Sequence, residues 1–116
     1  MIRSVILWHN PRCSKSREAL ALLEARGAQV VVRRYLEDAP GVDELRGLQS
    51  LLGVKAIEMM RTKETAFKDM GLSKDDPDET LLAAMAQEPK LIERPVLITG
   101  KRAIIGRPPE RVLDLL

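Results

Sequence analysis

The sequence is short of the residues that form covalent or metal cross-links. Its 116 residues include one cysteine, Cys13, and one histidine, His9. One cysteine excludes a disulfide within the chain, and a lone thiol is typical of proteins from reducing compartments, where it is a candidate nucleophile. One histidine and one cysteine cannot complete a tetrahedral shell, so we expect no metal site. We also expect no bound cofactor.

Long apolar runs and an excess of one charge are missing as well. The apolar stretch over residues 1–8 is too short for a secretion signal, and no run approaches the length of a membrane span. The net charge of +2, from 19 basic and 17 acidic residues, does not suggest a nucleic-acid or membrane partner. We therefore expect a cytoplasmic protein. A chain of 116 residues that is 45% hydrophobic fits one domain with its own core.

The apolar pattern predicts an α/β fold that begins with a βαβ unit. The continuous apolar run at residues 5–8 indicates a strand covered on both faces, and residues 30–32 indicate a second buried strand. Residues 14–26 between them are predicted to form a helix that ends at Gly27. This order predicts a parallel pair of strands with a right-handed crossover.

The middle of the chain is predicted to be a helical subdomain over about residues 41–90. Three segments with helical spacing are predicted as helices: residues 42–52, 54–61 and 63–70. A further helix is predicted to begin at Asp76, which can cap it, with Pro77 in the first turn and Glu79 at the capping-box position.

The last third is predicted to be a hairpin followed by a helix. Residues 95–99 and 102–105 are the predicted strands, with Gly100 in their turn, and a final helix begins near Pro108. The complete order predicts a four-stranded mixed β-sheet flanked by helices. The helical segment is then an insertion between the βαβ and ββα halves.

Cys13 lies where the loop after the first strand meets the first turn of a helix. The unpaired backbone N–H groups of that turn and the helix dipole favour an anion, so we expect a lowered pKa of the thiol. Arg17 lies one helical turn along and can face the sulfur, and Ser16 can donate a hydrogen bond to it. Arg12 and Lys15 add positive charge nearby. These features favour a nucleophilic thiolate over the alternative, a buried and inert cysteine.

Two further features of this loop limit its chemistry. The segment from Cys13 to Ser16 resembles a Cys-x-x-Cys motif whose second thiol is replaced by serine, so a covalent intermediate needs a thiol from outside. Ala19 stands where a Cys-x₅-Arg phosphatase loop has its arginine. His9 can either orient the loop or make a local hydrogen bond where the strand ends.

Three arginines far apart in the sequence are candidates for binding an oxyanion. Arg61, Arg94 and Arg107 each end a predicted structural element. Guanidinium groups bind tetrahedral oxyanions in a bidentate way, and in α/β domains such ends gather around the loop after the first strand. The alternative is that they are solvated surface charges. Arg94 and Arg107 each precede a proline that restricts the backbone.

Together these motifs resemble the ArsC-type arsenate reductases, and most of all the short YfgD-like branch of that family. The resemblance is carried by an ordered set of segments: His9-Asn10-Pro11-Arg12-Cys13-Ser14-Lys15-Ser16-Arg17, Tyr35-Leu36-Glu37, Met60-Arg61, Glu93-Arg94-Pro95 and Ile105-Gly106-Arg107-Pro108-Pro109-Glu110. It covers nearly the whole chain and implies a single thioredoxin-like ArsC domain over residues 1–116. It also implies that Pro95 is the cis-proline beside the active loop.

The resemblance implies an oxidoreductase of arsenic detoxification that reduces arsenate to arsenite. Cys13 would attack the arsenic, and Arg61, Arg94 and Arg107 would bind the oxyanion. Glutathione would be the co-substrate that displaces water on arsenic, and glutaredoxin would resolve the glutathionylated species. The residues that would support the thiolate are His9, Asn10, Ser16 and Arg17.

Two other functions fit parts of the pattern. A transcriptional regulator similar to Spx would bind RNA polymerase, but such proteins commonly carry a Cys-x-x-Cys switch, and Ser16 removes it here. A thiol reductase acting on glutathionylated proteins is the other alternative, although three arginines suit a small tetrahedral anion better. The chain also departs from the best-known glutaredoxin-coupled members at Ser14 and Lys15, where those longer proteins have glycine and threonine.

Overall fold

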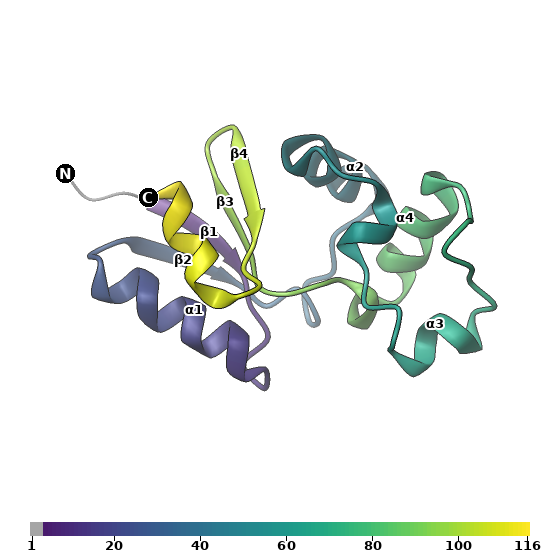
Figure 1. The fold of residues 1–116 in the computed structure, drawn as a ribbon, viewed down its shortest axis with the longest axis horizontal. Helices are drawn as coiled ribbons and strands as arrows, with labels where there is room; N and C mark the ends of the chain where they lie inside the picture. The colour runs from purple at the N-terminus through teal and green to yellow at the C-terminus, as the bar shows by residue number, and fades with distance from the viewer. Residues whose placement is uncertain (1–3) are drawn as a thin grey trace. The chain divides into compact units, whose positions relative to one another are not determined.

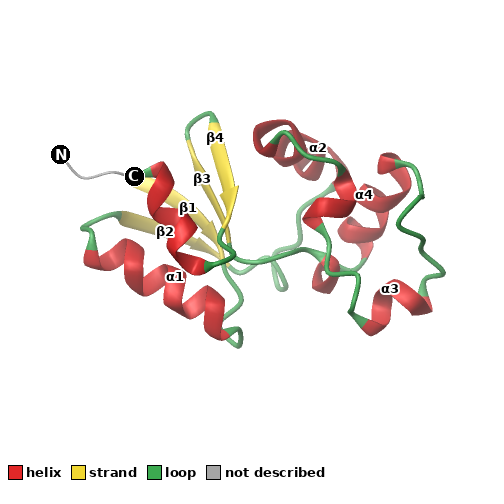
Figure 2. Ribbon diagram, viewed as in Figure 1, coloured by secondary structure: helices red, strands yellow, loops and turns green. Residues whose placement is uncertain are grey.

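The computed structural model describes residues 4–116. Its helices and strands, shown in Figure 2, are β1 (Ser4–Trp8), α1 (Ser14–Ala25), β2 (Gln29–Arg33), α2 (Val42–Leu52), α3 (Thr65–Asp69), α4 (Asp78–Gln87), β3 (Val96–Thr99) and β4 (Arg102–Ile105). The chain forms two compact units, one from Ala39–Glu93 and one from the segments on either side of it. That these units act as a single domain stays a prediction. Within the described range, no helix has the length and apolar character that crossing a membrane requires.

The sheet lies in the first unit and has the strand order β2-β1-β3-β4 (Figure 1). β1 pairs in parallel with β2, and α1 makes the connection between them. β3 pairs antiparallel with both β1 and β4. The predicted four-stranded mixed sheet is therefore confirmed, with the βαβ and ββα halves of a thioredoxin-like fold. In this topology, β1 ends at the loop that carries Cys13.

One face of the sheet packs against α1 and the C-terminal 3₁₀ helix (Pro109–Leu115). The buried residues of this core are Val5, Leu7, Ala19, Leu23, Leu97, Val112 and Leu115. Ala19 and Leu23 lie four residues apart, so they share the face of α1 that the sheet buries. This packing holds the start of α1 at the end of β1, where Cys13 lies.

The other face of the sheet is covered only in part: the predicted burial of residues 5–8 fails at Ile6, and the predicted burial of residues 30–32 was wrong. Ile6 and Val31 lie opposite one another in register, and their side chains are 41% and 52% exposed. Trp8 lies on the same face but is buried. The Tyr35 ring stacks on it, with 6.5 Å between the ring centroids, and Arg33 Cζ lies 5.2 Å from the centroid of the Trp8 ring. The covered end of this face is therefore the end from which the Cys13 loop leaves.

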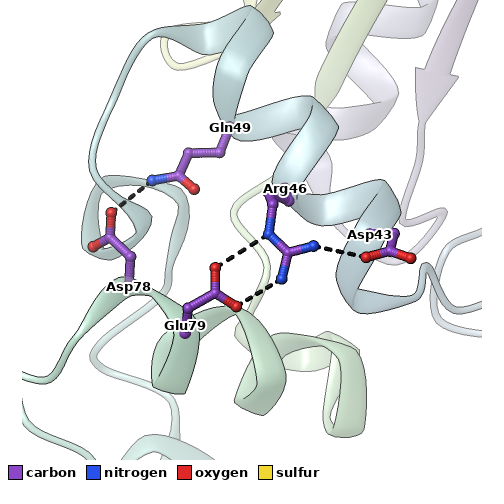
Figure 3. A network of polar contacts seen from close by, with 5 residues as sticks. All are labelled: Asp43, Arg46, Gln49, Asp78 and Glu79. Carbon is purple, nitrogen blue, oxygen red and sulfur yellow. Dashed lines mark hydrogen bonds and ion pairs between the residues drawn. The ribbon is translucent and has the colours of Figure 1, made fainter.

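In the second unit, a network of polar side chains joins α2 to α4 (Figure 3). Arg46 donates through Nε and Nη2 to the two carboxylate oxygens of Glu79, at 3.1 and 2.6 Å, and through Nη1 to Asp43 at 2.6 Å. Gln49 donates to Asp78 at 2.7 Å. The carboxylates of Glu79 and Asp43 raise the pKa of the Arg46 guanidinium, so Arg46 stays positively charged.

The start of α4 differs from the prediction. The helix begins at Asp78, with Pro77 at its cap position, rather than at a cap formed by Asp76. The Asp76 carboxylate instead accepts a hydrogen bond from the backbone N–H of Ser73 at 2.9 Å. Glu79 does not close a capping box because the Arg46 guanidinium offers it two charged donors.

Two predicted helices are 3₁₀ turns, and a third is shorter than expected. The prediction over residues 54–61 corresponds to Ala56–Met59, and the final helix to Pro109–Leu115. The prediction over residues 63–70 corresponds to α3, which has 5 residues. Segments this short gain little from α-helical propagation, and 3₁₀ turns are common in them.

Gly106 provides a test of the packing beside the candidate site. A Cβ atom there would lie 2.8 Å from Pro95 Cγ and 2.8 Å from Val112 Cγ1. We expect Gly106→Ala to lower the free energy of unfolding by about 1–3 kcal/mol through overpacking. Gly47→Ala is the matched control, because Gly47 lies within α2 and its Cβ would meet open space.

The control variant should raise the free energy of unfolding by about 0.5–1 kcal/mol, since alanine is the better helix former. Urea unfolding followed by circular dichroism measures both variants. If Gly106→Ala were as stable as the wild type, the close packing of the segments around Pro95 and Val112 would be contradicted.

Candidate active site

Hydrogen bonds within the loop after β1 hold it in a defined shape. The His9 N–H donates to the carbonyl oxygen of Arg33 at 2.8 Å, which ties the start of the loop to the end of β2. The Asn10 side chain accepts from the Arg12 N–H at 3.0 Å, and the Asn10 carbonyl accepts from the Cys13 N–H at 3.0 Å. The loop therefore delivers Cys13 to the N-cap position of α1.

The Cys13 thiol is partly buried and surrounded by hydrogen-bond donors. Burial raises the pKa of Cys13, but the backbone N–H of Ser16, the Arg94 side chain and the backbone N–H of Lys15 all donate to the sulfur and lower it. The donors outweigh burial, so the net pKa is below the ordinary value. The first turn of α1 and one arginine thus favour the thiolate.

Arg107 is the second arginine at the sulfur. Its Nη2 lies 3.7 Å from Cys13 Sγ, and its Nε donates to the carbonyl oxygen of Arg94 at 2.9 Å. The Nε bond fixes the guanidinium plane, so the position of Arg107 depends on the Arg94 backbone. The peptide bonds Arg94–Pro95 and Arg107–Pro108 are both cis, and the second was not predicted. Cys13, Arg94 and Arg107 therefore meet at one point, although more than eighty residues separate the cysteine from either arginine.

His9 and Ser16, which flank Cys13 in the sequence, form a buried pair. His9 Nδ1 and Ser16 Oγ share a hydrogen bond of 2.7 Å, and Ser16 Oγ accepts from the Asn10 N–H at 3.1 Å. Burial, Arg34 and Arg17 lower the pKa of His9, so the ring is neutral at neutral pH. Ser16 donates to the sulfur through its backbone N–H, while its hydroxyl is engaged with His9 and Asn10.

Arg17 was expected to face the sulfur, but its side chain supports the loop. Its Nη1 donates to the carbonyl oxygen of Pro11 at 2.9 Å. The long side chain turns back from α1 to satisfy a carbonyl group of the loop, which braces the segment before Cys13. Its effect on the thiolate is therefore indirect.

Arg61 belongs to the second unit and has its own partners there. Its Nε lies 3.2 Å from Glu64 Oε1, and its Nη1 lies 3.7 Å from Glu93 Oε1. Its backbone N–H donates to the carbonyl oxygen of Leu91 at 2.8 Å. Within that unit the guanidinium is thus held by two carboxylates, and its membership of the oxyanion site stays a prediction.

The arrangement around Cys13 combines a nucleophile with groups that bind anions. Two guanidinium groups and two backbone N–H groups converge on the sulfur. A tetrahedral oxyanion could accept hydrogen bonds from these donors and present its central atom to the thiolate. Among residues 4–116, no group of three histidine, cysteine or acidic side chains could hold a metal ion. The Lys15 N–H was not predicted by name as a donor to the sulfur. The unpaired N–H groups of the first helical turn, to which it belongs, were predicted to favour the thiolate.

Comparisons with known proteins agree in family and in structure. A family model described as the ArsC family matches residues 8–115. An arsenate reductase of Haemophilus influenzae is 46% identical over 115 residues, with 97% of this chain and 99% of the relative covered. YfgD of Escherichia coli strain K12 is 44% identical over 118 residues, covering 100% of this chain and 99% of the relative. The solved structure of an arsenate reductase from Vibrio cholerae superposes with a TM-score of 0.95 at 48% identity, and both chains are covered completely.

The first prediction from this site concerns ionisation of the thiol. Cys13 should ionise at a lower pH than an unperturbed cysteine, whose pKa is about 8.5. The ultraviolet absorbance of the thiolate, titrated against Cys13→Ser as the blank, measures this pKa. Arg94→Ala should raise it, because Arg94 donates to the sulfur.

The same shift makes stability depend on pH. A lowered pKa in the folded state contributes stability that is fully present above the pKa of the unfolded thiol and is lost as the pH falls through the folded pKa. The difference in unfolding free energy between wild type and Cys13→Ser should therefore shrink as the pH falls. A thiol that ionises no more readily than free cysteine would contradict this description of the site.

The second prediction concerns the buried hydroxyl. Ser16→Ala should lower the free energy of unfolding by about 1–3 kcal/mol, because His9 Nδ1 and the Asn10 N–H lose their buried partner. Ser14→Ala is the control, since Ser14 is exposed at the start of the same helix and should change stability little. Chemical unfolding measures both, and equal effects of the two substitutions would contradict a structural role for the Ser16 hydroxyl.

Proposed function

Because the chain belongs to the ArsC family, we propose that it is an arsenate reductase with Cys13 as its nucleophile. The family model and the relatives confirm the resemblance found in the sequence motifs. The observation that carries the proposal is the meeting of the Cys13 sulfur with the Arg94 and Arg107 side chains. The printed names of relatives that match almost the entire chain support arsenate as the oxyanion.

The first chemical step is attack of the Cys13 thiolate on arsenic. A sulfur–arsenic bond forms, and one arsenate oxygen leaves as water after it is protonated. Arg94 and Arg107 bind the remaining oxygens and stabilise the charge that develops on them. The family resemblance adds Arg61 as the third guanidinium of this anion site. His9 and Asn10 act on the thiolate through Ser16, by fixing the first turn of α1.

The second stage requires thiols from outside the chain. Ser16 stands where a resolving cysteine would be, and the 116 residues contain no other cysteine. The thiol of glutathione bonds to arsenic and displaces a second oxygen as water, so arsenic keeps its oxidation state. A glutaredoxin thiolate then attacks the glutathione sulfur and forms a mixed disulfide, and the electron pair of the broken sulfur–arsenic bond reduces arsenic from As(V) to As(III). Water replaces the Cys13 sulfur and releases arsenite. The dependence on reduced thiols favours the cytoplasm as the place of action.

A coupled assay with arsenate, glutathione, glutaredoxin and NADPH-dependent glutathione reductase tests this function. Cys13→Ser should abolish turnover, because no other thiol is present to attack arsenic. Arg94→Ala should lower kcat/KM for arsenate roughly ten- to hundredfold, the effect of losing one hydrogen bond to a charged group. Arg26→Ala is the matched control, because Arg26 is exposed at the opposite end of α1.

The outcomes separate the parts of the proposal. Absence of arsenite formation by the wild type, with an active arsenate reductase measured in parallel, would reject arsenate as substrate. Turnover in Cys13→Ser would remove Cys13 from the mechanism. An Arg94→Ala enzyme with an unchanged dependence on arsenate would show that Arg94 is a surface charge only.

A further inference from the structure

A cavity of about 230 Å³ lies beside the Cys13 loop and has no role in the mechanism so far. One wall is the loop segment 9–12, which directly precedes Cys13. The other wall is the turn after β2, from which Arg34, Leu36 and Glu37 line the cavity. Neither Arg94 nor Arg107 is among the lining residues, so this cavity is separate from the anion site at the sulfur.

The two walls are held together by the backbone. The His9 N–H donates to the Arg33 carbonyl at 2.8 Å, directly where the second wall begins. The Arg34 carbonyl accepts from the N–H groups of Glu37 and Asp38 at 3.0 and 2.9 Å, which folds the turn so that Arg34 and Glu37 lie on the same cavity. The cavity is therefore a formed feature of the fold.

The charged groups that line the cavity are not neutralised by ion pairs with any of the residues that the structure describes. Among residues 4–116, the side chains of Arg12, Arg34 and Glu37 make no ion pair and no side-chain hydrogen bond. Arg46 and Arg61 of the same chain are, by contrast, both paired with carboxylates. Two positive groups and one negative group are thus available to a ligand.

An apolar surface completes the lining. Leu36 is 39% exposed, and both Leu36 and Pro11 line the cavity. A ligand that fits this site carries negative groups for the arginines, a positive group for Glu37 and an aliphatic part between them.

We propose that this cavity binds the thiol co-substrate, a small peptide thiol with two carboxylates and an ammonium group, as in glutathione. The proposal rests on the function proposed above, because it locates the reductant of that reaction. An inorganic oxyanion fits less well, since Glu37 would repel it. The cavity is smaller than the roughly 300–1,000 Å³ of typical ligand pockets, so it holds part of the peptide, which suits a co-substrate that must bind and leave in each cycle.

The location explains how two co-substrates can be bound at once. Arsenate contacts Arg94, Arg107 and the sulfur, whereas the peptide contacts the segment 9–12 that directly precedes Cys13. Its thiol then replaces one oxygen on arsenic, and its proton leaves with that oxygen as water. The arginines keep their hold on the remaining oxygens.

Binding can be measured apart from turnover in the Cys13→Ser protein without a histidine tag. His9 lines the cavity and is the chain's one histidine, so its ring signal in NMR spectra reports occupancy directly. Titration with S-methylglutathione should shift this signal saturably. Arg34→Glu should weaken binding by about fivefold or more through lost and reversed charge interactions. Arg26→Glu, the same charge change on an exposed helix end, should leave binding unchanged.

Glu37→Lys distinguishes a peptide from a simple anion. If the cavity takes a ligand with an ammonium group, this substitution should weaken binding of S-methylglutathione, whereas a plain anion site should bind more tightly. Tighter binding in Glu37→Lys, or unchanged binding in Arg34→Glu, would overturn the proposal. Sulfate, titrated in parallel, should not reproduce the shift of the His9 signal.

Steady-state kinetics separate this proposal from the proposed function. Arg34→Glu should raise the KM for glutathione about fivefold or more, and by a larger factor than any change in the KM for arsenate. Normal turnover with an unchanged glutathione KM in this variant would reject the cavity as the thiol site and leave the arsenate reductase activity standing. If the wild type reduced no arsenate but S-methylglutathione binding still required Arg34 and Glu37, the function would fail and the peptide site would stand.

Discussion

The hydrogen bonds to the Cys13 sulfur are the interaction on which the rest of the site depends. Burial alone would raise the pKa of this thiol, but the N–H groups at the start of α1 and the Arg94 side chain lower it below the ordinary value. The sheet and the α1 core hold this helix end at the end of β1. The fold thus supplies positive potential through its backbone, and long side chains add to it from distant parts of the chain.

The supporting residues act by fixing this backbone rather than by adding charge. A histidine whose pKa is lowered carries no charge at neutral pH, so His9 acts through its hydrogen bond to the Ser16 hydroxyl. Arg17 likewise braces the Pro11 carbonyl. Both contacts stiffen the loop and the first turn that donate to the sulfur. The cavity shares residues 9–12 with this loop and offers charges of both signs to a ligand.

Structural features that depend on residues close in sequence could be predicted, and features that depend on partners from distant segments could not. The βαβ unit, the hairpin and the end of α2 at Gly53, with its φ of 68°, follow from apolar spacing and turn residues. The place of Cys13 at a strand–helix junction follows in the same way. The partner of Glu79, the direction of Arg17 and the use of the Ser16 hydroxyl were missed, because each depends on a group that another segment brings to it. The exposure of Ile6 was missed because an apolar run does not say what packs on it.

A crystal structure of the protein soaked in arsenate tests the central claim most directly. We expect arsenic bonded to, or in contact with, Cys13 Sγ, and arsenate oxygens on the guanidinium groups of Arg94 and Arg107. An anion bound elsewhere, with the sulfur and both arginines keeping the contacts they have in its absence, would contradict the account.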